Sequence, residues 1–155
     1  QRQMCIRDRN GGWHVIKTAK VTEAVEAAGK VIKVAKNHLF AVGDFVTAGG
    51  KFDGASDKIT IIDKSNAAYD SITLAAAIGA IAKDMVLVTV KAKTDAGSAE
   101  ATVETSEVAI TMAKVDLTVA NQSCGLMVRG TIEERNMPFP LDADLKKLMP
   151  LIRFV

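Results

Sequence analysis

Apolar residues occupy every second position in several short runs of this chain, with polar or small residues between them. Such an alternation places one set of side chains on each face of a β-strand, whereas a helix would scatter them around its circumference. We therefore predict a series of strands, each with one apolar face turned inward. The alternating apolar residues are Ile32 and Val34; Ile59 and Ile61; Ile72 and Leu74; Val86, Val88 and Val90; Val108, Ile110 and Met112; and Val115, Leu117 and Val119.

Residues 126–133 predict one long late strand with a charged outer face. Leu126, Val128, Gly130 and Ile132 share one parity, while Met127, Arg129, Thr131 and Glu133 share the other. Gly130 is expected at a bulge or at a close backbone approach.

Turns and one helix complete the local prediction. Residues 48–54 and 65–69 are rich in Gly, Asn, Asp and Ser, which favour turns. Residues 21–28 carry both helix-favouring Ala and Glu and helix-disfavouring Val and Thr, so their state stays ambiguous. Asp142 is expected to cap a short helix, because Leu145, Leu148 and Met149 follow at helical spacing and Pro150 ends the run.

These elements predict a mostly β protein. We expect a small antiparallel β-barrel or sandwich-like module over residues 10–96, and a second small β module with a short C-terminal helix and an apolar tail over residues 97–155, with the boundary near Gly97. Residues 1–9 have no periodicity and resemble a translated sequencing adapter, so they are interpreted as a non-native N-terminal remnant. They also lack the apolar core of a signal peptide.

Composition and charge limit the classes of partner that the chain is expected to bind. The 155 residues are 48% hydrophobic and 25% charged, as expected for a folded globular chain. The 20 Lys and Arg balance 18 Asp and Glu and are interspersed with them, so we predict no nucleic-acid binding, which needs a clustered basic footprint. No apolar run approaches the length of a transmembrane helix, and none is predicted.

Few residues in the sequence indicate a metal-binding or catalytic site. His14, His38 and the cysteines Cys5 and Cys124 are too few and too scattered for a metal site, and no metal or cofactor is expected. We interpret His38 as a structural histidine at the end of a strand. Asp44, Asp63 and Asp70 stand in turn contexts, where Asp hydrogen-bonds to the backbone. The chain is therefore predicted not to be an enzyme.

Three segments carry a resemblance to a known family. They are VIKVAKNHLFAVGDFV at residues 31–46, ITIIDKSNAAYDSITL at 59–74, and GLMVRGTIEERNMPFPLDADLKKLMPLIRFV at 125–155. Together they resemble the head-fibre and auxiliary capsid, or head decoration, proteins of phages of gut bacteria. The matching positions of the first two segments are Lys36, His38, Val42, Gly43, Asp44, Asp63, Ser65, Asn66, Tyr69 and Asp70.

The resemblance implies a structural virion protein on the outside of a phage capsid, made in the bacterial cytoplasm. Its partners would be the major capsid protein and further copies of itself in a homo-oligomer, with a trimer as one candidate. The C-terminal segment is the predicted assembly or capsid-binding site. The residues assigned to it are Pro138, Phe139, Pro140, Leu145, Leu148, Leu151, Ile152, Phe154 and Val155.

Two other functions stay open. A carbohydrate- or cell-surface-binding β module would use exposed loops such as residues 49–57, with Trp13 or Tyr69 on an exposed face. A small hydrolase would need two carboxyl groups about 5 to 10 Å apart in a cleft.

Overall fold

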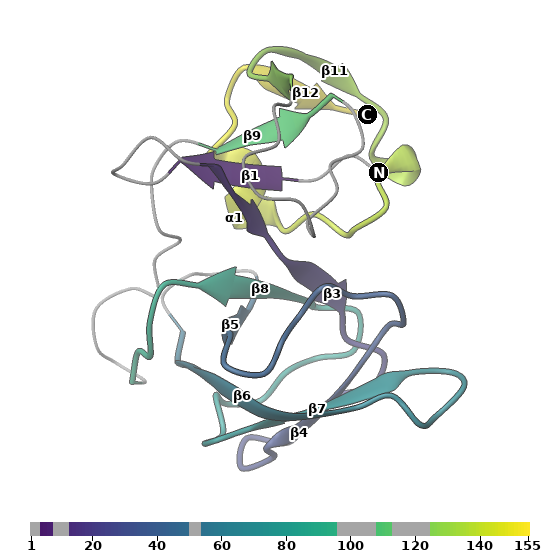
Figure 1. Ribbon diagram of the computed structural model, residues 1–155, viewed down its shortest axis with the longest axis vertical. Helices are drawn as coiled ribbons and strands as arrows, with labels where there is room; N and C mark the ends of the chain where they lie inside the picture. The colour runs from purple at the N-terminus through teal and green to yellow at the C-terminus, as the bar shows by residue number, and fades with distance from the viewer. Residues whose placement is uncertain (1–3, 8–12, 50–53, 96–107, 113–124) are drawn as a thin grey trace. The chain divides into compact units, whose positions relative to one another are not determined.

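The computed structural model describes residues 4–7, 13–49, 54–95, 108–112 and 125–155 (Figure 1). The chain forms two compact units. Unit 1 comprises Gln1–Ile16 with Glu104–Val155, and unit 2 comprises Lys17–Val103. Strands dominate both units and helices are short, so the predicted mostly β class is confirmed. The predicted boundary near Gly97 lies outside the described residues.

Unit 2 is a six-stranded antiparallel sheet in the order β3-β8-β5-β6-β7-β4. Its strands are β3 (Thr18–Lys20), β4 (Val31–Val34), β5 (Phe45–Ala48), β6 (Ser56–Asp63), β7 (Asp70–Leu74) and β8 (Val86–Val90). The first half of β6 pairs with β5 and its second half with β7, so β6 carries the sheet from one side of the unit to the other. In Figure 1, β3, β8 and β5 lie above β6, β7 and β4.

The core of unit 2 is filled from both halves of this sheet. Ile32, Ile72 and Leu74 contribute from β4 and β7, and Val46 and Leu87 contribute from β5 and β8. The predicted inward faces of β4 and β7 are confirmed. In β8 both parities are buried: Val88 and Val90 as predicted, together with Leu87, which is the β8 residue of this core.

The predicted inward face of β6 is half wrong. Ile59 is fully buried, but Ile61 is 58% exposed. A β-bulge between these residues sets both Thr60 and Ile61 opposite Thr73, and this extra residue reverses the facing of every position after it. Ile62 therefore takes the inward position and packs against the core in place of Ile61.

The sheet of unit 2 does not close into a barrel, so the sandwich-like alternative describes it better. An isolated bridge joins Val21, just after β3, to Val34 at the end of β4. Two hydrogen bonds flank it, from Thr22 N to Lys33 O at 2.9 Å and from Ala35 N to Lys20 O at 2.9 Å. This single bridge is too short to make a strand ladder. Residues 21–28, whose state was ambiguous, form bridges and a turn and no helix.

Unit 1 contains a four-stranded antiparallel sheet in the order β10-β9-β1-β2 and a parallel pair, β11 with β12. Its strands are β1 (Met4–Arg7), β2 (Trp13–Ile16), β9 (Val108–Thr111), β10 (Leu126–Met127), β11 (Gly130–Ile132) and β12 (Ile152–Phe154). Residues 4–7, which the sequence analysis left out of the fold, pair with both β2 and β9.

Two predictions for unit 1 are wrong, and a third concerns residues that the structure does not describe. All four residues of β9 are buried, but Met112 lies just beyond the strand and is 58% exposed, so its predicted inward position is wrong. The long late strand is also wrong, because a bend at Val128 and Arg129 divides it into β10 and β11. The strand predicted at Val115, Leu117 and Val119 lies outside the described residues.

The predicted C-terminal helix is confirmed. It is α1 (Ala143–Lys147), preceded by the short 3-10 helix η1 (Glu134–Asn136). The Asp142 carboxylate accepts a hydrogen bond from Asp144 N at 2.9 Å, which satisfies one free N–H of the first turn. Leu145 and Met149 are buried as their spacing predicts, and Leu148 is half-buried.

Candidate functional site

The nine residues predicted for assembly divide by burial. Leu145 and Ile152 are buried, Phe139, Pro140, Leu148 and Phe154 are half-buried, and Pro138, Leu151 and Val155 are exposed. A buried side chain is already used by the fold. The residues that remain available to a partner are mainly Leu151, which is 62% exposed, and Val155, which is 57% exposed.

Leu151 and Val155 stand on one side of the last strand. Side chains alternate along a strand, so residues 151, 153 and 155 face one way and residues 152 and 154 the other. Leu151, Arg153 and Val155 are exposed, whereas Ile152 is 6% exposed and Phe154 is half-buried. We call Leu151, Arg153 and Val155 the outer row.

Several contacts hold the outer row in place. Val155 N donates to Ile132 O at 2.9 Å, and Val155 O accepts from Glu134 N at 2.8 Å. Lys146 of α1 forms an ion pair with Glu134 at 2.6 Å, and its ammonium lies 5.7 Å from the centre of the Phe154 ring. The end of the chain is thus fixed to β11, η1 and α1.

The family-like residues after β4 form a turn. Asn37 and Gly43 have φ of 64° and 101°, a left-handed conformation that Asn tolerates and Gly adopts freely. The Asp44 carboxylate accepts a hydrogen bond from Ala41 N at 2.8 Å and pairs with Lys17 Nζ at 2.7 Å. The VGD motif is therefore explained by the shape of this turn.

The segment after β4 also contributes to a polar cluster of Lys36, His38 and Asp70, the first residue of β7; His38 and Asp70 are buried and the Lys36 side chain is 30% exposed. Lys36 Nζ lies 2.7 Å from one carboxylate oxygen of Asp70 and donates to Lys64 O at 3.1 Å. His38 Nδ1 accepts from Phe40 N at 3.2 Å, so the neutral ring carries its proton on Nε2. Nε2 lies 3.2 Å from the other oxygen of Asp70, but the contact is not aligned as a hydrogen bond and this nitrogen has no hydrogen-bond partner within the described part of the chain.

Burial dominates the electrostatics of His38. The side chain is 0% exposed, and this desolvation lowers the pKa of His38 below its ordinary value. Asp70 opposes the shift, while the positive charges of Lys64 and Lys36 add to it. The ring is therefore neutral near pH 7, in keeping with its interpretation as a structural histidine.

The remaining family-like residues shape the loop between β6 and β7. The Asp63 carboxylate accepts a hydrogen bond from Ser65 N at 2.9 Å, and this bond lowers the pKa of Asp63. The Asn66 side-chain oxygen accepts from Ala68 N at 2.8 Å. Tyr69 is half-buried, and Lys33 Nζ lies 5.1 Å from its ring centre in a cation–π arrangement. The side chain of Trp13 lies outside what the structure describes.

Sequence reasoning named Lys36, His38 and Asp70 separately but missed that they meet. Two signals were available: Lys36 and His38 follow one strand closely, and Asp70 begins another. The unknown was the pairing of β4 with β7, which sets Val34 opposite Asp70.

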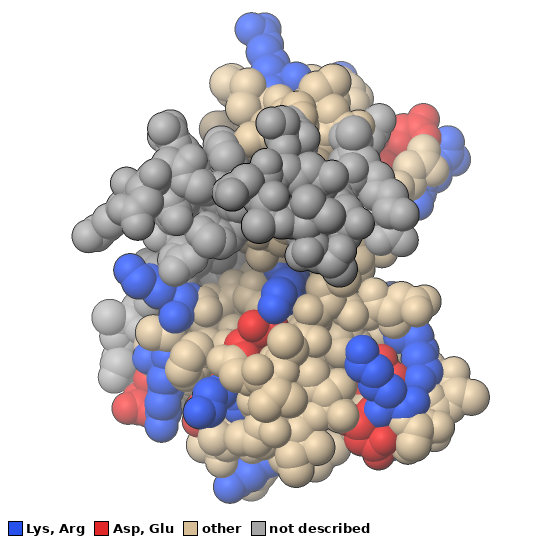
Figure 2. Space-filling model, viewed as in Figure 1, with Lys and Arg blue, Asp and Glu red and all other residues tan. Residues whose placement is uncertain are grey.

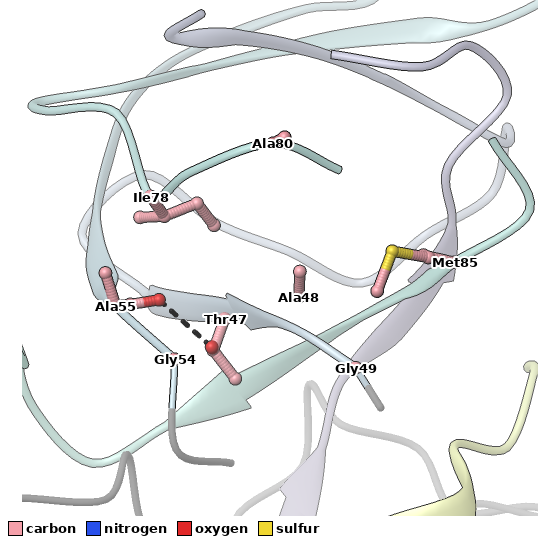
Figure 3. A pocket seen from close by; sticks show the side chains of 8 residues that line it. All are labelled: Thr47, Ala48, Gly49, Gly54, Ala55, Ile78, Ala80 and Met85. Atoms are coloured by element: carbon pink, nitrogen blue, oxygen red, sulfur yellow. Dashed lines mark hydrogen bonds between the residues drawn. The ribbon is translucent and has the colours of Figure 1, made fainter. Parts of the chain in front are cut away.

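A pocket of about 380 Å³ lies between β5 and the segment that leads into β8 (Figure 3). Small and apolar groups line it, among them Ala48, Ile78 and Met85. The hydroxyl of Thr47, which also lines it, already donates to Ala55 O at 3.0 Å. Among the described lining residues there is no charged side chain, so the pocket is mostly apolar and offers no charge to a ligand. The sequence analysis did not anticipate it.

Among the described residues, neither charged nor metal-binding groups gather at a further place. Over the face of unit 2 seen in Figure 2, blue and red side chains are interspersed rather than gathered into a basic area. In the described ranges, no three His, Cys, Asp or Glu side chains come together as metal ligands. None of the helices in those ranges has the length and apolar character needed to traverse a bilayer.

Comparison of the chain with protein-family models, with curated proteins and with solved structures finds no match.

Proposed function

We propose that the chain is a structural virion protein, a head fibre or capsid decoration protein that attaches to the outside of a phage capsid through its outer row. The observation that carries the proposal is the division of β12 into a buried side and an exposed apolar side. Leu151 and Val155 are 62% and 57% exposed, whereas Ile152 between them is 6% exposed.

Physical chemistry favours such a row as a contact. Apolar surface gains about 25 cal/mol for each Å² removed from water, and little entropy is lost when the strand that carries it is already fixed. Arg153 lies between the two apolar side chains, and Arg is among the residues enriched at protein interfaces. The row is therefore suited to burial against another protein surface.

The family resemblance is what supports a phage capsid as that surface. Most of the matching residues of the first two segments stabilise turns or belong to the cluster of Lys36, His38 and Asp70, so they serve the shape of unit 2. The partners under this proposal are the major capsid protein and further copies of the chain, because capsid proteins commonly meet in symmetric homo-oligomers.

The test is co-sedimentation of the full chain with capsids of the phage whose genome encodes it. Replacing Leu151 and Val155 together by Ser is expected to weaken binding at least about tenfold, the equivalent of 1.4 kcal/mol. The matched control is Val42→Ser, since Val42 is 63% exposed but belongs to unit 2.

Equal binding by the double variant and the control would refute the role of the outer row. If the wild-type chain does not sediment with capsids but is retained by host-cell polysaccharide, the carbohydrate-binding alternative replaces the virion proposal. Light scattering on the same samples reports the oligomer, and the double variant is expected to have the smaller mass if the row also joins copies of the chain.

A further inference from the structure

Lys36, His38 and Asp70 have an arrangement that suits a covalent reaction between side chains. We propose that Lys36 and Asp70 become joined by an amide bond between Nζ of the lysine and Cγ of the aspartate, with His38 assisting, and with the loss of one water molecule. The inference is independent of the proposed function.

The fold brings the two reacting groups together. β4 and β7 are antiparallel neighbours with Val34 opposite Asp70, and Lys36 lies two residues beyond Val34. Lys36 Nζ lies 2.7 Å from Asp70 Oδ1, and the aspartate side chain is 3% exposed. Groups held at such a distance react with effective concentrations far above those available in solution.

His38 places an N–H close to the carboxyl group. Its Nδ1 accepts from Phe40 N, which leaves the proton on Nε2, and Nε2 lies 3.2 Å from Asp70 Oδ2. The side chain is 0% exposed and Nε2 has no hydrogen-bond partner among the described residues. This N–H is not aligned as a hydrogen bond to Asp70 before the reaction, and under the proposal it aligns as negative charge develops on Oδ2 and stabilises that charge.

The step balances without a further reactant. One proton passes from the Lys36 ammonium to Asp70 Oδ1, which gives a neutral amine and a carboxylic acid. Nζ then forms a bond to Cγ, and negative charge develops on Oδ2 opposite His38 Nε2. The bond from Cγ to Oδ1 breaks as a second proton moves from Nζ to Oδ1, so water leaves and an amide remains.

The chain provides its own comparison. Lys17 and Asp44 are also paired at 2.7 Å, but their side chains are 25% and 21% exposed. The other contact described for the Asp44 carboxylate is the main-chain N–H of Ala41, at 2.8 Å. The two lysines are similarly exposed, at 25% for Lys17 and 30% for Lys36, but Asp44 is far more open to water than Asp70, which is 3% exposed. The contacts described for Asp44 include no imidazole, so this pair is expected to stay an ion pair.

The test is the mass of the full chain measured under denaturing conditions. The wild-type protein is expected to be lighter than its sequence by one water. Tryptic digestion should release residues 34–51 joined to residues 65–83, because a modified Lys36 is not cleaved. The Lys36→Arg variant, which keeps the positive charge, should show the full sequence mass.

Two further variants separate the roles. Asp70→Asn should lose ammonia in place of water at the same linkage. His38→Phe keeps a ring without the N–H and should leave most of the chain at full mass; equal reaction in this variant would remove His38 from the mechanism. A wild-type chain at full sequence mass, or a linkage at Lys17 and Asp44, would overturn the proposal whether or not the variants fold.

Discussion

Replacing Ile59 and Ile61 separately by alanine tests the β-bulge in β6. The two residues are identical in type and two positions apart in one strand, and a regular strand would give them the same environment. The bulge instead leaves Ile59 at 0% exposure and Ile61 at 58%. Ile59 packs in the core with Ile32, Ile72 and Leu74.

The expected losses of stability differ widely. Changing Ile to Ala removes three carbon groups, worth about 2.5 kcal/mol of transfer free energy at a fully buried site, and the cavity left behind raises the cost to about 2 to 5 kcal/mol. At the exposed Ile61 the change should stay within about 0.5 kcal/mol. Ile62→Ala should fall between them, because Ile62 is partly buried against the core.

Urea unfolding followed by circular dichroism measures these losses. With an m-value of about 2 kcal/mol per M, a loss of about 3 kcal/mol lowers the midpoint by about 1.5 M. Hydrogen exchange of peptides from β6 and β7 assigns the change to unit 2. Similar losses for Ile59→Ala and Ile61→Ala would mean that the strand runs without the bulge, and the reasoning from burial would be refuted.

Two further predictions concern single groups. Because burial lowers the pKa of His38, the unfolded chain takes up the proton first as the pH falls below about 6.5, so stability should decline from there downward. Melting temperatures between about pH 7 and pH 5 should show a steeper decline for the wild type than for His38→Gln, and equal slopes would contradict the assignment. Asp142→Ala removes the acceptor that caps α1 and should cost about 1 kcal/mol in urea unfolding. Asp142→Asn keeps an acceptor and should cost much less, so equal losses would show that the cap is not the cause.

Much of the fold could be predicted from the period-two pattern. Strands β4, β6, β7 and β8 of unit 2 and the inward faces of β4 and β7 follow from it, whereas β3 and β5 do not. The capped helix follows from Asp142 and the spacing of Leu145 and Met149. The pattern failed where a single residue changed the register. The bulge at Thr60 and Ile61 has no sequence signal of its own, because it depends on the pairing with β7. The bend at Val128 and Arg129 has a partial signal in Gly130, where a bulge or a close backbone approach is expected, and a Cβ at Gly130 would lie only 3.0 Å from Met127 Sδ.

The candidate sites were harder to predict, since they depend on which strands pair. Lys36 and Asp70 are 34 positions apart, and only the pairing of β4 with β7 makes them neighbours. The pocket beside β5 likewise joins Thr47 and Ala48 to Ile78 and Met85 through a connection that turn signals do not specify.

The parallel pairing of β11 with β12 changes how the C-terminal segment should be interpreted. The apolar residues among 151–155 are costly to expose to water, so we expect each of them either to pack on the core or to contact a neighbour. The register that sets Gly130 opposite Ile152 makes these two outcomes coexist in one strand. Ile152 packs on the core, whereas Leu151 and Val155 are exposed and could contact a neighbour. Because one side of β12 is packed, its other side is held in a fixed position. Binding of a partner to this ordered row would therefore not lose the conformational entropy of ordering a mobile segment.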